Sequence, residues 1–143
     1  MDDINFNIEK VSIPDFNPEF FRLWISHIVM ELDRKIGEIS YIFCTNEYIL
    51  GINKQYLKHD YYTDIITFDY TEGLVLGGDI FISVETVLEN ANEYSEGDFS
   101  LELNRVIIHG VLHLCGYNDK SDVDQKKMTE MENWALEEML RFT

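Results

Sequence analysis

The chain contains few of the residues that mark disulfide-rich secreted domains and nucleic-acid-binding proteins. Its 143 residues include two cysteines, two prolines and 11 lysines and arginines, against 27 aspartates and glutamates. Two cysteines are too few for a disulfide framework, and both lie in apolar segments. We therefore interpret Cys44 and Cys115 as buried thiols in a reducing compartment.

We expect neither a membrane anchor nor a secretion signal. No segment reaches the roughly 18 uninterrupted apolar residues of a membrane span. The first residues, Met-Asp-Asp-Ile, are acidic where a signal peptide is basic. We therefore expect a cytoplasmic protein without membrane contact, and we predict no nucleotide cofactor.

The shortage of basic residues bears on nucleic-acid binding. The formal net charge is −16 at pH 7, so the overall field of the chain repels a polyanion such as RNA. No basic segment offsets this repulsion. Any RNA contact is therefore expected to be local, with a bound metal ion and a few nearby cations opposing the global charge.

Length and composition predict one globular domain spanning residues 1–143. Hydrophobic residues make up 45% of the chain and aromatic residues 13%, which is typical of folded proteins. A chain of this length buries a substantial core but is too short for two domains. No internal repeat, linker or low-complexity segment divides it.

Hydrophobic periodicity predicts alternating strands and helices. We expect strands at 4–11, 39–44, 63–70 and 74–83. We expect helices at 18–35, 46–58, 83–94, 101–115 and 121–140. The last two strands are close enough along the chain to pair as antiparallel neighbours. The prediction is an α+β domain with a mixed four-stranded sheet that has an antiparallel edge and packs against about five helices.

Three local features of this prediction concern breaks and buried faces. Gly37 is expected to end the first helix, and Gly77-Gly78 to mark a bulge or a close backbone approach within the last strand. The second and last helices are expected to bury one apolar face each. These faces contain Tyr48, Ile49, Ile52, Tyr56 and Leu57 in the second helix, and Val123, Met128, Met131, Trp134, Ala135 and Leu140 in the last.

The stretch 109–119 has the spacing of a metal site. It reads His-Gly-Val-Leu-His-Leu-Cys-Gly-Tyr-Asn-Asp and begins inside the apolar, proline-free segment 101–115, which is predicted to be a helix. His109 and His113 lie one turn apart on one helix face. Gly116 is suited to a left-handed helix end, so the chain can turn back and bring Asp119 toward the imidazoles. Three ligands with one open position are typical of catalytic zinc.

An alternative interpretation assigns this stretch a purely structural role. The two histidines would then be core side chains bonded to backbone carbonyls, and the residues after Cys115 only a helix cap and a turn. We favour the metal site, because a buried helix rarely places two polar residues on one face without a partner. Gly110 indicates that something packs closely against the helix, since glycine costs roughly 1 kcal/mol there relative to alanine. Cys115 points to another side of the helix and is not predicted as a ligand.

Three motifs resemble the YbeY family of bacterial endoribonucleases. The stretch from His109 is similar to the family pattern His-Gly-x-Leu-His-Leu-x-Gly-Tyr-Asp-His, and residues 53–68 are similar to Asn-x-x-Tyr-Arg-x-x-Asp-x-Pro-Thr-Asp-Val-Leu-Ser-Phe. Gly-Asp-Ile at 78–80 matches a third pattern. Among the departures from these patterns, Asp119 replaces a ligand histidine, Leu57 a cleft arginine and Tyr62 a proline.

The resemblance implies a zinc-dependent endoribonuclease that is specific for single strands. Such an enzyme acts in late ribosomal RNA maturation, including processing at the 3′ end of 16S rRNA, and in ribosome assembly and quality control. It implies one Zn2+ held by His109, His113 and Asp119, and it implies rRNA, the small ribosomal subunit and a ribosomal protein as partners. Lys58 and His59 are cationic or titratable groups near the position of the missing arginine, and we regard them as possible cleft residues.

Two other functions are compatible with the same residues. One is a ribosome-assembly factor without catalytic activity, in which zinc only pins the C-terminal helices. The other is a metallopeptidase, because the zinc helix is metzincin-like and matches the His-Glu-x-x-His-x-x-Gly-x-x-His spacing. Gly110 occupies the place of the general base of those peptidases, which disfavours peptide hydrolysis.

Overall fold

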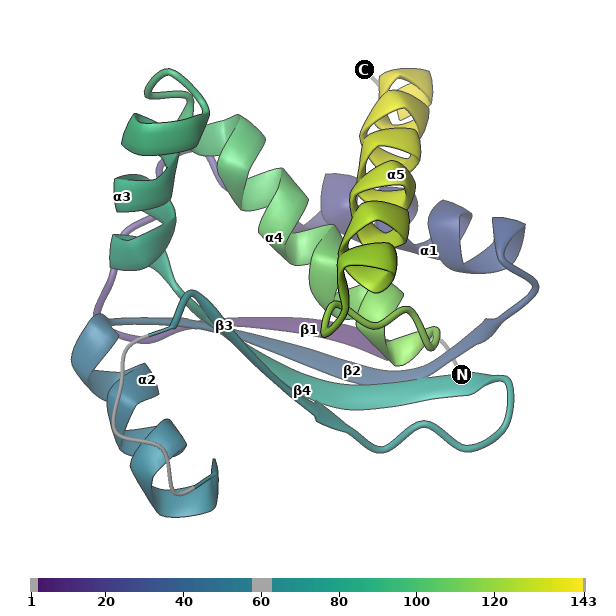
Figure 1. Cartoon of the computed structure of the whole chain (residues 1–143), viewed down its shortest axis with the longest axis horizontal. Coiled ribbons are helices and arrows are strands. Elements are labelled where there is room, and N and C mark those ends of the chain that lie inside the picture. Colours follow the sequence, from purple (N-terminus) through teal and green to yellow (C-terminus); the bar gives the residue numbers. More distant parts are fainter. Residues whose placement is uncertain (1–2, 58–62, 143) are drawn as a thin grey trace.

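A mixed four-stranded sheet and five α-helices make up the described part of the chain (Figure 1). The computed structural model describes residues 3–57 and 63–142. The elements are β1 (Asp3–Ile8), α1 (Pro18–Glu31), β2 (Lys35–Cys44), α2 (Asn46–Ile52) followed by a π-helical turn (Asn53–Leu57), β3 (Ile65–Asp69), β4 (Val75–Ser83), α3 (Val84–Tyr94), α4 (Phe99–Leu114), α5 (Asp122–Glu138) and a 3-10 turn (Met139–Phe142).

The strand order in the sheet is β1-β2-β4-β3. β1 pairs in parallel with β2, and β2 pairs in parallel with β4. β3 pairs antiparallel with β4 and forms the outer edge. The predicted α+β class and the mixed sheet with an antiparallel edge are therefore confirmed.

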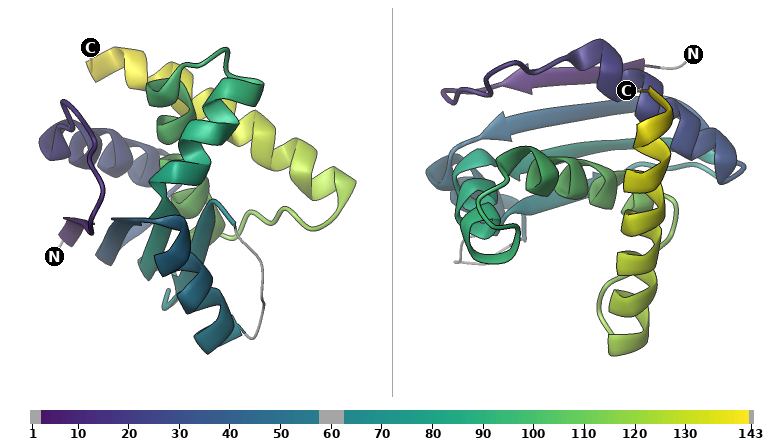
Figure 2. Two further views of the ribbon diagram at one scale, coloured as in Figure 1. Left: turned by 90° about the vertical axis from the view of Figure 1, so that its left-hand side faces the viewer. Right: turned by 90° about the horizontal axis from the view of Figure 1, so that it is seen from above.

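The helices cover the two faces of the sheet unequally. Figure 1 shows α1, α3, α4 and α5 on one side of the sheet and α2 on the other, and the views in Figure 2 agree. The main core lies under the four helices. Two buried polar groups are bonded there, because Tyr41 Oη donates to the carbonyl of Ile107 at 2.8 Å and Trp24 Nε1 to that of Ala135 at 2.8 Å. A smaller cluster around Cys44, Ile49 and Ile66 lies under α2.

Helices α2 to α5 begin directly after a polar residue whose side chain caps the N-terminus. The hydroxyls of Thr45, Ser83 and Ser121 accept backbone N–H groups at the N-termini of α2, α3 and α5. The carboxylate of Asp98 does the same for α4. These bonds satisfy backbone amides that have no partner inside the helix.

The prediction for Gly37 was wrong. α1 ends at Glu31, and Gly37 lies inside β2 instead of terminating a helix. A Cβ at Gly37 would lie 2.9 Å from Val75 Cγ1 and 3.0 Å from Leu76 O, so the glycine permits close pairing of β2 with β4. The register of this pair shifts between Ile36 and Ile39. The bulge predicted at Gly77-Gly78 in β4 therefore lies in β2, opposite these glycines.

Part of the predicted buried surface is exposed. α2 and its π-helical turn leave the side chains of Tyr48, Tyr56 and Leu57 exposed, because only one narrow face of this segment meets the sheet. Val123 and Leu140 are also exposed. The buried positions on and just after α5 are Met128, Glu132, Ala135 and Met139, and neither Val123 nor Leu140 has the helical spacing that would place it on that stripe.

Candidate metal centre

Helix α4 holds the candidate site against the sheet through a close contact at Gly110. A Cβ at this position would lie 3.0 Å from two side-chain atoms of Ile80 and 3.3 Å from Ile65 Cδ1. These isoleucines belong to β4 and β3, so they are the close neighbours that the glycine predicted. At the end of the helix, a Cβ at Gly78 would lie 3.0 Å from Leu114 Cδ2 and 2.5 Å from Phe68 O. Both glycines let α4 lie directly on the β3–β4 edge.

The chain reverses direction immediately after α4. Gly116 has φ +101°, a conformation that glycine adopts without steric cost. Its amide donates to His113 O at 3.0 Å, and the amide of Tyr117 donates to Leu112 O at 3.1 Å. This pair of bonds is a Schellman motif. It turns the chain back toward the histidine face, as predicted.

Two of the three predicted ligands lie against each other. His109 Nε2 is 3.3 Å from Asp119 Oδ2. His113 is anchored separately, because its Nδ1 lies 3.2 Å from the carbonyl oxygen of Tyr117. Within residues 3–57 and 63–142, no group of three or more His, Cys, Asp or Glu side chains is assembled so that it could hold a metal ion. The complete ligand set stays a prediction.

A buried carboxylate from helix α5 contacts the first histidine. The side chain of Glu132 is 9% exposed. Its Oε2 lies 2.7 Å from His109 Nδ1, and its Oε1 accepts from Arg105 Nη1 at 2.9 Å. Arg105 also donates to Asn133 Oδ1 at 2.9 Å. Both imidazoles therefore have Nδ1 against an acceptor oxygen, which leaves Nε2 as the nitrogen available to a ligand.

A polar pocket of about 330 Å³ opens beside His109. Among the described residues, four carboxylates and one guanidinium face it, and none of the lining side chains is a lysine. The pocket is thus acidic and matches the overall charge of the chain. Its lining residues are Thr63, Asp64, Ile65, Glu102, Arg105, Val106, His109, Asp119 and Glu132.

The carboxylates raise the pKa of His109. Burial of the ring lowers this pKa, but the hydrogen bond and charge of Glu132 and the charges of Asp119 and Asp64 outweigh burial. Burial raises the pKa of the Cys115 thiol to about 11, against a smaller opposing effect of Arg34. Cys115 is therefore a protonated thiol in the core.

Comparison with known proteins identifies the family. The model of the family described as endoribonuclease YbeY matches residues 3–140. The chain belongs to the YbeY family. The resemblance inferred from three short motifs therefore extends over nearly the whole chain.

Individual relatives agree with this assignment over most of their length. A protein named endoribonuclease YbeY from Bacteroides thetaiotaomicron is 48% identical over 133 residues, which cover 93% of this chain and 96% of the relative. One of the same name from Parabacteroides distasonis is 50% identical and covers 93% of both chains. The solution structure of a Thermotoga maritima protein is 28% identical, with a TM-score of 0.68 over 94% of this chain and 88% of that one.

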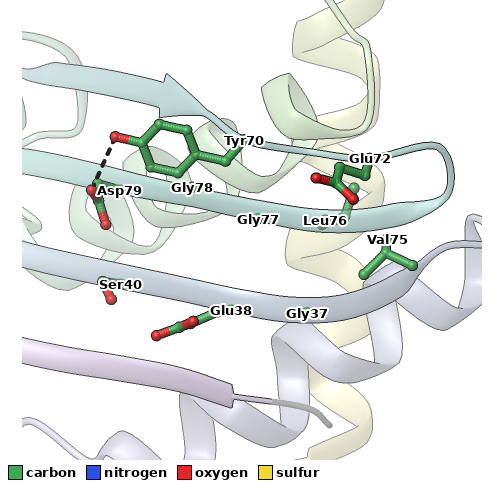
Figure 3. Close-up of a pocket in the computed structure, with 10 residues that line it drawn as sticks. All are labelled: Gly37, Glu38, Ser40, Tyr70, Glu72, Val75, Leu76, Gly77, Gly78 and Asp79. Carbon is green, nitrogen blue, oxygen red and sulfur yellow. Dashed lines mark hydrogen bonds between the residues drawn. The ribbon is translucent and has the colours of Figure 1, made fainter.

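Not every residue singled out by the YbeY resemblance lies at the pocket beside His109. Asp64 lines this pocket. Asp79 instead lines another pocket of about 480 Å³ on the sheet face away from α4, where Tyr70 Oη donates to it at 3.3 Å (Figure 3). Within residues 3–57 and 63–142, no histidine lines this second pocket. Lys58 and His59 lie outside the described residues, so their proposed cleft position stays a prediction.

Sequence analysis missed three residues of the pocket, Glu132, Arg105 and Glu102. Glu132 and Glu102 occupy buried positions of α5 and α4. An acidic residue in step with apolar ones along a helix was the available indication, because a buried carboxylate needs a partner. Glu102 accepts from Ser95 Oγ at 2.9 Å. The partner of Glu132 could not be identified from α5 alone, because it belongs to another helix.

Proposed function

We propose that this chain is a zinc-dependent endoribonuclease that cleaves single-stranded regions of ribosomal RNA during late maturation of the small subunit. The observation that carries this proposal is the match to the endoribonuclease YbeY family over residues 3–140. The close approach of His109 and Asp119 beside an open pocket supports it. We further propose processing at the 3′ end of 16S rRNA and a cytoplasmic location.

The available nitrogen atoms suit a zinc ion. His109 and His113 both have Nδ1 against an oxygen acceptor, which is the usual arrangement of metal-ligating histidines. With Asp119 they form a nitrogen and oxygen donor set of the kind that catalytic zinc uses. Zinc supplies Lewis acidity that polarises a phosphoryl oxygen and lowers the pKa of water.

The other side chains of the pocket have roles that follow from their chemistry. The carboxylates of Asp64 and Glu102 line the pocket and can accept a proton from a water molecule there. Arg105 offers the only guanidinium in the described lining, and its N–H groups can bond a phosphate oxygen. The pocket therefore combines proton acceptors with one anion-binding group.

The packing of Gly110 supports nuclease over peptidase chemistry. Metzincin peptidases need a glutamate at this position as general base. Here the position is glycine, and even a Cβ would lie 3.0 Å from Ile80. The chain thus lacks the peptidase base at this position, which is closely packed against β4.

Cleavage of short RNAs by the purified chain tests the proposal. Labelled single-stranded RNA with the sequence of a 16S 3′ end is incubated with zinc-loaded protein, with chelator-treated protein and with His113→Ala. We expect cleavage only by the zinc-loaded protein, and none of the same sequence in a duplex. His27→Ala is the matched control, because His27 pairs with Glu138 away from the pocket. Zinc binding without cleavage, on free RNA and on small-subunit particles, would instead indicate an assembly factor with structural zinc.

A further inference from the structure

The buried carboxylate of Glu132 occupies a position where α5 otherwise buries apolar side chains. The neighbouring positions on the same stripe are Met128, Ala135 and Met139. Burying an ionised carboxylate costs free energy unless the group is paired and hydrogen-bonded. Glu132 can therefore be ionised at this core position only because its hydrogen-bonding partners compensate the cost of burial.

The two oxygens of Glu132 have different partners. Oε1 accepts from Arg105 at 2.9 Å, while Oε2 lies 2.7 Å from His109 Nδ1. Arg105 carries a permanent positive charge and neutralises the buried carboxylate. The second oxygen is thereby left to orient the imidazole of His109.

The position of Glu132 determines which ring nitrogen of His109 faces Asp119. With Nδ1 bonded to Glu132, the opposite nitrogen, Nε2, lies 3.3 Å from Asp119 Oδ2. A carboxylate that holds the far nitrogen of a ligating histidine fixes the ring orientation and raises the basicity of the ligand. We propose that Glu132 is a positioning residue that holds His109 Nε2 toward the metal centre. This inference rests on the proposed zinc site.

The chain offers a matched control for a purely structural role. Glu138 lies on the same helix and pairs with His27 Nε2 at 2.9 Å, which ties α5 to α1. Its side chain is 18% exposed. Glu138→Gln therefore removes the charge from a similar histidine–carboxylate pair on α5 without touching a predicted zinc ligand.

Zinc affinity of the full chain tests the role of Glu132. Metal-free protein is titrated with Zn2+ in competition with a chromophoric chelator, and thermal unfolding of the metal-free proteins is recorded in parallel. We expect Glu132→Ala to bind zinc about 10- to 100-fold more weakly than wild type. Glu132→Gln keeps an acceptor oxygen but loses the charge, so its zinc affinity should fall between those of wild type and Glu132→Ala. Glu138→Gln should retain wild-type zinc affinity.

The outcomes separate this inference from the proposed function. Absence of zinc binding by the wild type would overturn the metal site and, with it, the role of Glu132. Tight zinc binding by the wild type and by Glu132→Ala alike would overturn only the positioning role. If Glu132→Ala does not fold, a zinc affinity of Glu132→Gln equal to that of wild type would likewise overturn only the positioning role. If Glu138→Gln weakens zinc binding as much as Glu132→Gln does, the cause is disruption of α5 and not a changed orientation of the His109 ring.

Discussion

At the scale of single residues, the site depends on groups that the chain brings together around one helix end. His109 and Asp119 are ten positions apart, and the turn at Gly116 places them within 3.3 Å of each other. His113 lies on the same helix and is oriented by the carbonyl of Tyr117. The groups brought together carry imidazole nitrogens and a carboxylate oxygen, which are donor atoms that zinc prefers.

Replacement of His113 should abolish tight zinc binding. We expect the purified wild-type chain to hold one zinc ion and His113→Ala to hold none, because two remaining protein ligands are too few for a stable site. Elemental analysis after dialysis measures this difference. His27→Ala serves as the control and should retain the metal. Equal zinc in wild type and His113→Ala would show that His113 is not a ligand.

The aspartate at position 119 should be a working replacement for the family histidine. Asp119→His should keep zinc, because both side chains are competent ligands, and Asp119→Ala should release it more readily. The rate at which a chelator removes zinc from the three proteins compares them directly. If wild type and Asp119→Ala lose zinc at the same rate, Asp119 is only a turn residue. Gln125 Nε2 also stabilises this turn, because it donates to Asp119 O at 3.0 Å.

At the scale of elements, the position of α4 depends on its contact with the β3–β4 edge. Gly110 and Gly78 remove side chains from this contact, so the helix backbone approaches the strands closely. The same helix carries both predicted imidazoles. A change that pushes α4 away from the sheet therefore affects stability and the metal site together.

Two glycine-to-alanine substitutions in helices should have opposite effects on stability. At Gly110 the added methyl group would lie 3.0 Å from Ile80 and 3.3 Å from Ile65. Overpacking typically costs about 1–3 kcal/mol, and with both isoleucines this close we expect the cost to exceed the roughly 1 kcal/mol gained in helix propensity. At Gly51, an exposed position of α2, no atom lies within 4 Å of the added methyl group. Urea unfolding should show Gly110→Ala less stable than wild type, and Gly51→Ala more stable by up to about 1 kcal/mol.

The contrast between these variants identifies the cause. A stabilised Gly110→Ala would mean that the two isoleucines move aside at little cost and that α4 does not depend on close packing. Similar m-values for all three proteins are needed for the comparison, because a changed slope indicates a change in the exposed surface of the unfolded or native state.

At the scale of the whole molecule, the net charge of −16 opposes binding of RNA. The pocket beside His109 does not reverse this, because four carboxylates and one arginine line it. We propose that positive charge from a metal ion and a few cations allows RNA to bind, and that a ribosomal protein supplies further affinity.

RNA binding should consequently depend only weakly on salt. Each neutralised phosphate of a single strand contributes about −0.7 to the slope of log affinity against log salt, and we expect a slope equivalent to about two or three phosphates. Binding of free RNA should be weak and should fall further when Lys58 and His59 are both replaced by alanine. A salt series of fluorescence anisotropy titrations measures both effects. A steep slope, or no change in the double variant, would place the phosphate-binding surface elsewhere on the protein.

Much of the fold was predictable because it depends on neighbours in the sequence. The caps at Thr45, Ser83 and Ser121 follow from a polar side chain that precedes an apolar helix. The helical spacing of His109 and His113 and the left-handed glycine that follows them are likewise local. Errors arose where burial depended on distant packing, as for Val123, which is 79% exposed.

The family could be inferred from three short motifs, and the type of fold and the histidine pair from local backbone preferences and periodic apolar residues. The side chains that contact the histidine helix became known only from the packing of the folded chain. Ile80 and Ile65 explain Gly110, and Glu132 reaches His109 from 23 residues further along the chain. Such contacts depend on how α5 packs across α4. The periodicity of either helix predicts a buried face, but not which residue of the other helix lies against it.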